Sequence, residues 1–221
     1  MGKEAATQKP KPERSEQIQQ IQAQPKPPQK IAGKRFEDYL KDLHSGDPKV
    51  RIKGIVSIQR SGDPRAAAEL TAMLTDSDTG VKVAAITALG WIRDRSVVPA
   101  LITTLDTDKE KMVKSEAARV LGELGDRRAV PILTTALSDA AWEVRRSAVL
   151  ALGRIGDPST KWAVRKKLED RDARVRMAAA YALGDVGGKI DLPDLIYRRF
   201  FDPNPDVKSE AAKAIEKILK K

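Results

Sequence analysis

A valine followed by a basic residue recurs along this chain at a nearly constant interval, and this period limits the fold more than any other feature. The valines are Val50, Val81, Val113, Val144, Val175 and Val207, separated by 31, 32, 31, 31 and 32 residues. Eight residues after each valine stands Leu or Ile, and four residues after it stands Gly or Ala. Six copies at one period predict a stacked array rather than a single globular core.

Each copy has the pattern of a helix pair. First helices are predicted at residues 65–74, 97–105 and 129–137, and residues 36–43 supply the first helix of copy one. The second helix starts at the valine. Four glycines are predicted to close second helices in left-handed geometry: Gly62, Gly125, Gly156 and Gly187. Candidate N-caps of the next helix follow at Asp63, Asp126 and Asp157. The approximate repeats are 34–63, 64–94, 95–126, 127–157, 158–188 and 189–221.

The recurring pattern D-x-x-V-R-x-x-A-x-x-A-L-G-x-I-G-D, as in DARVRMAAAYALGDVGG at residues 172–188, resembles HEAT repeats, in particular the short HEAT-like repeats of bilin-lyase-related proteins. The resemblance covers residues 34–221 and implies a right-handed all-α solenoid of about six helix pairs, with the second helices lining the concave face. Three copies have another residue where the rest have Asp47, Asp78 and Asp172, namely Glu110, Ala141 and Asn204. An Asp–Arg ladder between repeats is therefore expected to be interrupted in these copies.

Residues 1–33 differ in composition from the rest, because they are rich in Lys, Gln and Pro. Such a segment buries too little apolar surface to fold alone, so a disordered basic arm is predicted. Residues 1–35 carry eight Lys or Arg against three Asp or Glu, which is half of the net charge of +10. Ile18 and Ile21 lie at helical spacing in this arm, which predicts either a segment that folds on a partner or a solvated linker.

Composition also excludes several classes of protein. No apolar run is long enough to span a membrane and the start lacks a secretory signal, so we expect a cytoplasmic protein without membrane contact. The chain has no cysteine and one histidine, His44. Thiolate or histidine metal sites and a Ser-His-Asp triad are therefore not expected. One histidine cannot supply the His-Glu pairs of HEAT-like hydroxylases, and no spacing identifies the Trp, Asp and Arg of HEAT-like DNA glycosylases. We predict a non-catalytic, monomeric protein without a cofactor.

Helical geometry divides each second helix into two sides. Counted from the valine, offsets 0, +4, +7, +8 and +11 are apolar or small and predict the core, whereas offsets −1, +2, +3, +6 and +10 face away from it. Aromatic, Met and Arg side chains on that outer side are typical of an interface centre. The predicted partner-binding residues are Val83, Trp91, Met112, Arg119, Trp142, Arg146, Leu150, Arg154, Met177 and Tyr181. The alternative is that these side chains only pack against neighbouring repeats.

Two sets of basic residues bear on nucleic-acid binding. The residues that follow the valines lie beside the core and are expected to pair with aspartates at the helix starts. The second set clusters in copies five and six: Arg165, Lys166, Lys167, Arg171, Arg174, Arg198 and Arg199. We predict a scaffold that binds a protein partner on the concave face. The alternatives are a nucleic-acid-associated HEAT protein that uses the arm and this basic set, and, with less support, a bilin-lyase-like or chaperone-like accessory protein.

Overall fold

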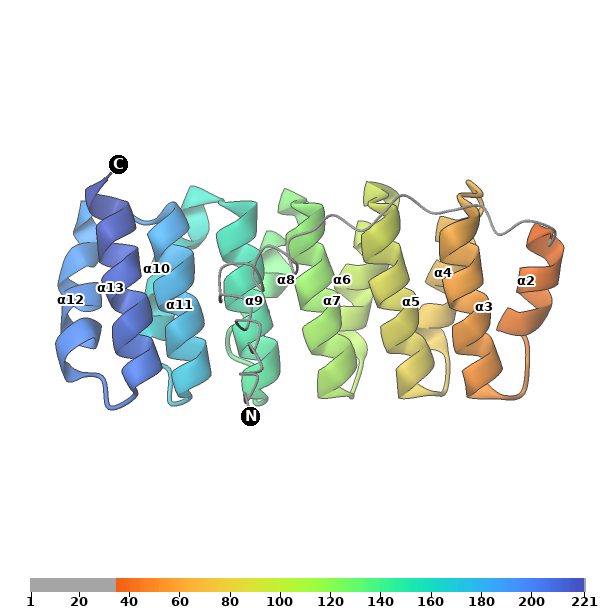
Figure 1. The fold of residues 1–221 in the computed structure, drawn as a ribbon, viewed down its shortest axis with the longest axis horizontal. Coiled ribbons are helices and arrows are strands. Elements are labelled where there is room, and N and C mark those ends of the chain that lie inside the picture. The colour runs from red at the N-terminus through yellow and green to blue at the C-terminus, as the bar shows by residue number, and fades with distance from the viewer. Residues whose placement is uncertain (1–34, 221) are drawn as a thin grey trace, which may run out of the picture.

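The computed structural model describes residues 35–220, whose regular elements are all helical, and six helix pairs follow one another along one axis (Figure 1). The first helices form one row: α2 (Phe36–Leu43), α4 (Ala66–Ala72), α6 (Val98–Thr107), α8 (Val130–Ala136), α10 (Lys161–Lys166) and α12 (Leu192–Phe201). The second helices form the other row: α3 (Pro48–Ser61), α5 (Thr79–Ile92), α7 (Lys111–Leu124), α9 (Trp142–Ile155), α11 (Ala173–Val186) and α13 (Pro205–Leu219). The chain is an all-α solenoid, as predicted, and the predicted arm at residues 1–33 lies outside the described residues.

Short 3-10 turns join the two rows. Four of them precede first helices: η2 (Arg95–Val97), η3 (Arg127–Ala129), η4 (Pro158–Thr160) and η6 (Lys189–Asp191). Two others, η1 (Met73–Thr75) and η5 (Lys167–Glu169), follow α4 and α10. The predicted caps are confirmed, because Asp126 and Asp157 accept hydrogen bonds at the starts of η3 and η4 and Asp63 accepts one from the backbone of Arg65. Within residues 35–220 no helix is both long and apolar enough to cross a membrane.

The helix ends follow the predicted chemistry with one exception. Gly62, Gly125 and Gly156 close their helices with φ of 65°, 63° and 67°, in the left-handed region as predicted. Gly187 also follows its helix, but its φ is −74°, so the prediction of left-handed geometry is wrong there. The cause is a different turn, in which a Cβ on Gly187 would lie 2.2 Å from the carbonyl oxygen of Leu183. Close approach of the backbone, rather than a positive φ, therefore accounts for this glycine.

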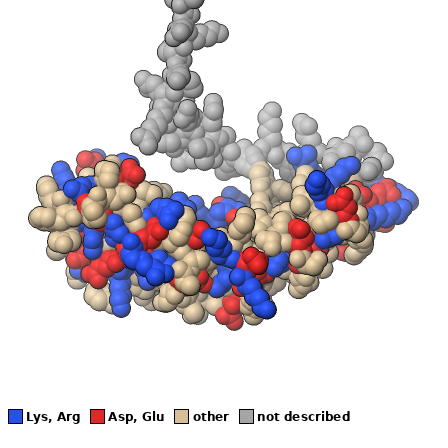
Figure 2. All heavy atoms as spheres, turned by 90° about the horizontal axis from the view of Figure 1, so that it is seen from below, with Lys and Arg blue, Asp and Glu red and all other residues tan. Residues whose placement is uncertain are grey.

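Second helices pack closely against each other through glycines nine residues after the valine. A Cβ placed on Gly122 would lie 2.5 Å from the Cα of Ala151, and one on Gly153 would lie 2.7 Å from the Cβ of Ala182. Larger side chains, such as Leu101 and Leu133, fill the space around the first helices. Closer spacing in one row than in the other bends the array, and the second helices lie on its hollowed side (Figures 1 and 2).

An unbroken ladder of ion pairs joins consecutive repeats. The basic residue after each of the first five valines pairs with an aspartate of the next repeat, in the pairs Arg51–Asp76, Lys82–Asp108, Lys114–Asp139, Arg145–Asp170 and Arg176–Asp202. The predicted interruption at Glu110, Ala141 and Asn204 is therefore wrong. The ladder uses an aspartate five residues before the valine, whereas the predicted position, three residues before it, is the N-cap of the second helix. At Glu110 and Ala141 the second helix has no hydrogen bond from its backbone to an N-cap side chain, but the ion-pair ladder continues.

Candidate partner-binding surface

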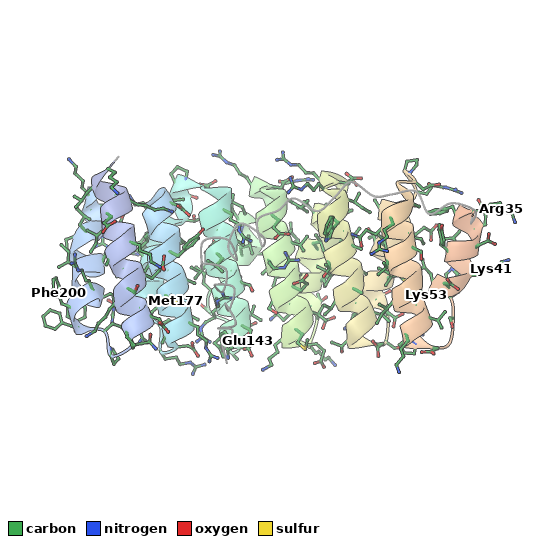
Figure 3. All side chains as sticks on the ribbon, viewed as in Figure 1. Arg35, Lys41, Lys53, Glu143, Met177 and Phe200 are labelled. Carbon is green, nitrogen blue, oxygen red and sulfur yellow. The ribbon has the colours of Figure 1, made fainter. Side chains whose placement is uncertain are left out.

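The residues at offsets −1, +2, +3, +6 and +10 of the six second helices form one surface, which we call the second-helix face. It lies on the hollowed side of the array, where Lys53, Glu143 and Met177 mark helices α3, α9 and α11 (Figure 3). Three large apolar side chains stand well out of the core on this face. Trp91, Met112 and Tyr181 are 46%, 61% and 47% exposed. The Lys217 ammonium lies 5.4 Å from the ring centroid of Tyr181, and the exposed parts of the three side chains face solvent.

The other predicted apolar residues are less accessible. Val83, Trp142 and Leu150 are half-buried and pack against the core, so part of their area stabilises the solenoid itself. Met177 is half-buried one helical turn before Tyr181 on α11. Val83, Trp142 and Leu150 therefore pack against neighbouring repeats, which was the predicted alternative. Trp91, Met112 and Tyr181 instead expose about half of their surface or more to solvent.

A charged network crosses the middle of the second-helix face on α7. The Arg119 guanidinium donates to Glu116 at 2.6 Å and to Glu123 at 2.5 Å, and the hydroxyl of Thr87 donates to Glu116 at 2.6 Å. Burial alone would raise the pKa of Glu116, but the hydrogen bonds from Arg119 and Thr87 outweigh it and hold the pKa below its ordinary value. Arg154 lies 3.9 Å from Glu123. The Arg119 guanidinium is therefore paired with carboxylates of its own helix, α7.

Other cations on this face are free to meet a ligand. Arg146 on α9 and Lys53 and Arg60 on α3 form no ion pair with a carboxylate of the described residues. Arg174, at the edge of the face, behaves differently: its guanidinium carbon lies 3.3 Å from the centroid of Trp142 and it pairs with Asp172 at 2.7 Å. The hydrogen bond from Arg174 lowers the pKa of Asp172 to about 2. Trp142 is therefore covered on one side by a fixed cation.

Most of the predicted basic set is engaged with the protein itself. Arg165 pairs with Asp194, Arg198 lies 3.5 Å from Asp202, and Lys167 lies 4.0 Å from Asp170. Arg174 pairs with Asp172 as described, and Arg171 donates to the carbonyl of Ala140 at 3.0 Å. Lys166 and Arg199 are exposed and have no carboxylate partner among the described residues. The set spreads from α10 to α12, and its charges are largely balanced by nearby carboxylates.

The structure adds an exposed aromatic group that sequence reasoning missed. Tyr197, Phe200 and Phe201 on α12 are 54%, 58% and 69% exposed, and Trp162 on α10 is 71% exposed. The signal was present in LPDLIYRRFF, where Ile196, Tyr197, Phe200 and Phe201 widen the apolar stripe beyond the side on which Leu195 lies. It is visible only once Leu195 is known to face the core.

The described residues hold little that suggests catalysis. No group of three or more His, Asp or Glu side chains within 35–220 is arranged to hold a metal ion. An open depression of about 400 Å³ between the start of α5 and the end of α6 is lined by hydroxyl side chains such as Thr75, Thr79 and Thr107, beside the ladder pair Lys82–Asp108. Because that aspartate is already paired, it is poorly placed to act as a base for these hydroxyls.

Comparison with known proteins supports the repeat architecture. A family model described as HEAT repeats matches residues 37–116, 98–184 and 136–216. The complex of CpcE and CpcF of phycocyanin lyase from Nostoc sp. PCC7120 is similar in structure, with a TM-score of 0.61 and 21% identity over 88% of this chain and 90% of that chain. A designed armadillo repeat protein in complex with the peptide (KR)4 has a TM-score of 0.60 and 18% identity over 84% of this chain and 100% of that chain.

A mutant of Kap121p has a TM-score of 0.66 and 14% identity over 86% of this chain, which corresponds to 24% of that much longer chain. At these identities the likeness shows the fold alone. No curated protein matches the sequence.

Proposed function

Because the chain belongs to the HEAT-repeat family, we propose that it is a non-catalytic scaffold that binds a protein partner along its second-helix face. The observation that carries this proposal is the exposure of Trp91, Met112 and Tyr181 on the hollowed side of the array. Trp and Tyr are enriched among the residues that dominate binding energy at interfaces, and Met is enriched at interfaces generally. Packing between repeats accounts for the half-buried residues but leaves these three without a structural role.

The charge of the face indicates the kind of partner. A designed armadillo repeat protein of similar fold is in complex with a basic peptide. Here Lys53, Arg60 and Arg146 stand on the second-helix face without carboxylate partners among the described residues, so an extended segment of neutral or acidic character fits better. Such a segment would place apolar side chains against Trp91 and Tyr181, on either side of the network on α7.

The nucleic-acid alternative is favoured by the net charge of +10 and by the basic residues of copies five and six. Its support is weaker in the structure, because four of the seven residues in that set lie within 4.0 Å of a carboxylate. If nucleic acid is the ligand, log affinity falls with log salt with a slope of about −0.9 per phosphate contacted. Similarity to the phycocyanin lyase complex, the basis of the accessory-protein alternative, concerns the fold alone.

Site-specific photo-cross-linking of the full chain tests the proposal. Benzoylphenylalanine is placed at Trp91 or Tyr181, and at Thr134, which is exposed on α8 in the row of first helices, as the matched control. In native lysate we expect the same protein adduct from Trp91 and Tyr181 and none from Thr134. Adducts of equal yield from all three positions, or adducts with nucleic acid alone, would contradict the proposal.

A further inference from the structure

The last first helix, α12, carries large apolar side chains on the side that faces solvent. Leu195 is fully buried, yet Ile196, Tyr197, Phe200 and Phe201 on the opposite side are 44%, 54%, 58% and 69% exposed. We call these four residues the α12 aromatic face. The outer side of a helix on a protein surface is normally polar. Uncharged side chains gather at the C-terminal end of the array (Figure 2), and Phe200 lies at its extremity (Figure 3).

Comparison within the chain shows that the repeat does not require these residues. Helix α6 has the same length as α12, a proline at the same position, and a ladder aspartate directly after it. Where α12 has Tyr197, Phe200 and Phe201, α6 has Thr103, Asp106 and Thr107, which are all exposed. Polar residues therefore satisfy the solenoid at these positions. The aromatic side chains of α12 need another explanation.

Cations lie over the rings of the α12 aromatic face. The rings of Tyr197 and Phe201 lie 5.2 Å apart, the Arg198 guanidinium is 5.2 Å from the Tyr197 ring, and that of Arg199 is 5.3 Å from the Phe200 ring. Arg198 is held by Asp202. Arg199 has no carboxylate partner among the described residues and is exposed. The face thus offers aromatic rings and a free positive charge side by side.

A second copy of the chain does not fit this end by stacking as another repeat. Continuation of the ladder would require an aspartate opposite Lys208, but copy one has Ser45 at that position. Close packing would require a small residue where α13 has Glu216. Nor is the face large enough for a dimer of like faces: it exposes on the order of 450 Å², taking roughly 200 Å² for each aromatic residue. A stable dimer needs about 800 Å² from each copy.

The N-terminal segment of the chain is also a poor occupant. Residues 1–35 carry eight Lys or Arg against three Asp or Glu, so this segment has the same sign of charge as Arg199. A face of this size suits a short ligand with two or three apolar anchors. Arg199, which lies beside the Phe200 ring and has no carboxylate partner among the described residues, favours acidic residues beside those anchors.

We propose that the α12 aromatic face is a second docking site, which binds a short amphipathic and acidic segment of a partner protein. Its apolar side chains lie on Tyr197, Phe200 and Phe201, and a Glu or Asp pairs with Arg199. This site is separate from the second-helix face, so the chain joins two partners, or two parts of one partner, at a distance set by the solenoid.

Selection from a displayed library of random helical peptides, with the intact full-length chain as the target, tests this proposal. We expect enriched peptides with apolar residues three or four positions apart and Asp or Glu between them. For these peptides, Phe200→Ser with Phe201→Ser should weaken affinity about tenfold or more. Arg199→Glu should weaken binding of the acidic peptides at least about threefold. The control Trp91→Ser, on the second-helix face, should leave affinity unchanged, which separates this proposal from the proposed function.

Several outcomes would overturn the proposal. Enrichment of basic peptides that lose affinity in the Phe200→Ser/Phe201→Ser variant, or the absence of any enriched acidic peptide that does so, shows that the face does not bind acidic segments. Binding of a single-stranded oligonucleotide that this variant abolishes would make the face a stacking platform for nucleic acid. A dimer in sedimentation velocity that the variant abolishes would assign the face to self-association. Because all substituted side chains are exposed, a loss of folding is not expected to obscure these results.

Discussion

Arg93 follows α5 with φ of 57°, in the position where Gly62, Gly125 and Gly156 follow their helices. A side chain in left-handed geometry costs on the order of 1 kcal/mol or more, and Arg93 is exposed with no ion pair among the described residues. Arg93→Gly should therefore raise the free energy of unfolding by about 1 kcal/mol in urea titrations. Gly62→Ala, at a position with φ of 65°, should lower it by a similar amount. An unchanged urea midpoint for both variants would show that this geometry carries no strain.

The ladder pairs differ in burial, and this decides what each contributes. Side chains of Arg145 and Asp170 are both 5% exposed, and Arg145 also donates to the carbonyl of Ala140 at 2.9 Å. Asp170→Asn keeps an acceptor for the backbone of the turn but leaves Arg145 without a counter-charge. We therefore expect the free energy of unfolding to fall by about 3 kcal/mol. In the control Asp194→Asn, the lost partner of Arg165 is 44% exposed, and the loss should stay within about 1 kcal/mol. An equal fall in the free energy of unfolding for Asp170→Asn and Asp194→Asn would show that burial does not decide the contribution of these ion pairs.

Aspartates at helix starts make the fold sensitive to acid. Hydrogen bonds from the side chain and backbone of Arg128 lower the pKa of Asp126 to about 2, and the pKa of Asp172 is about 2 as well. In an unfolded chain the pKa of an aspartate carboxyl is about 4. The stability that Asp126 and Asp172 contribute is therefore complete above about pH 4 and is lost as the pH falls towards 2. The urea midpoint should be flat from about pH 5 to 7 and fall below about pH 4. A double Asp126→Asn/Asp172→Asn variant should show a shallower fall.

At the scale of helices, glycine sets the distance between neighbouring repeats. A Cβ on Gly153 would lie 2.7 Å from the Cβ of Ala182 on the next second helix. Gly153→Ala should cost about 1 to 3 kcal/mol through overpacking. Ala182→Gly opens that space, so the two changes should couple favourably by at least about 1 kcal/mol in a double-mutant cycle. Gly46→Ala, with no atom within 4 Å of the new Cβ, is the control and should be neutral. Additive effects of the pair would show that these helices do not touch through Gly153.

Helices could be predicted from the sequence more closely than the contacts between them. Each second helix is predicted to start at its valine and begins two residues before it. The prediction is close because the apolar period and the helix starts are local properties of the chain. The partner of Arg145 is not local, since it depends on how one repeat lies on the next. Asp170 and its equivalents recur in five copies and were as visible as the N-caps, but sequence alone does not show which carboxylate a neighbouring arginine reaches. The close packing at Gly153 could not be predicted either, because it also depends on how one repeat lies on the next.

For the whole molecule, one surface was predictable and the other was not. Trp91 and Tyr181 were placed outside the core from helical period alone, because the core side of a second helix is marked by its small and branched residues. In α12, apolar residues occupy both sides, so the period could not show that Leu195 faces the core and Phe200 faces solvent. Alignment with α6 separates them, because Leu101 is buried at the position of Leu195 and Asp106 is exposed at the position of Phe200. The arrangement as a whole is a curved stack, and the two proposed binding surfaces lie along its hollowed side and at its C-terminal end.

The central claim is that the second-helix face binds a partner without being needed for folding. Met177→Ala with Tyr181→Ala removes one patch of that face, and Leu152→Ala removes a side chain that is 1% exposed. Leu152→Ala should cost about 2 to 5 kcal/mol of stability. The double variant should change the free energy of unfolding by only about 0.5 kcal/mol.

The direct test measures both the melting temperature of this double variant and its affinity for the protein cross-linked at Tyr181. The account predicts a nearly unchanged melting temperature and an affinity about thirtyfold weaker, the size of a hot-spot loss of about 2 kcal/mol. Unchanged affinity with unchanged stability, or a large loss of stability, would contradict it.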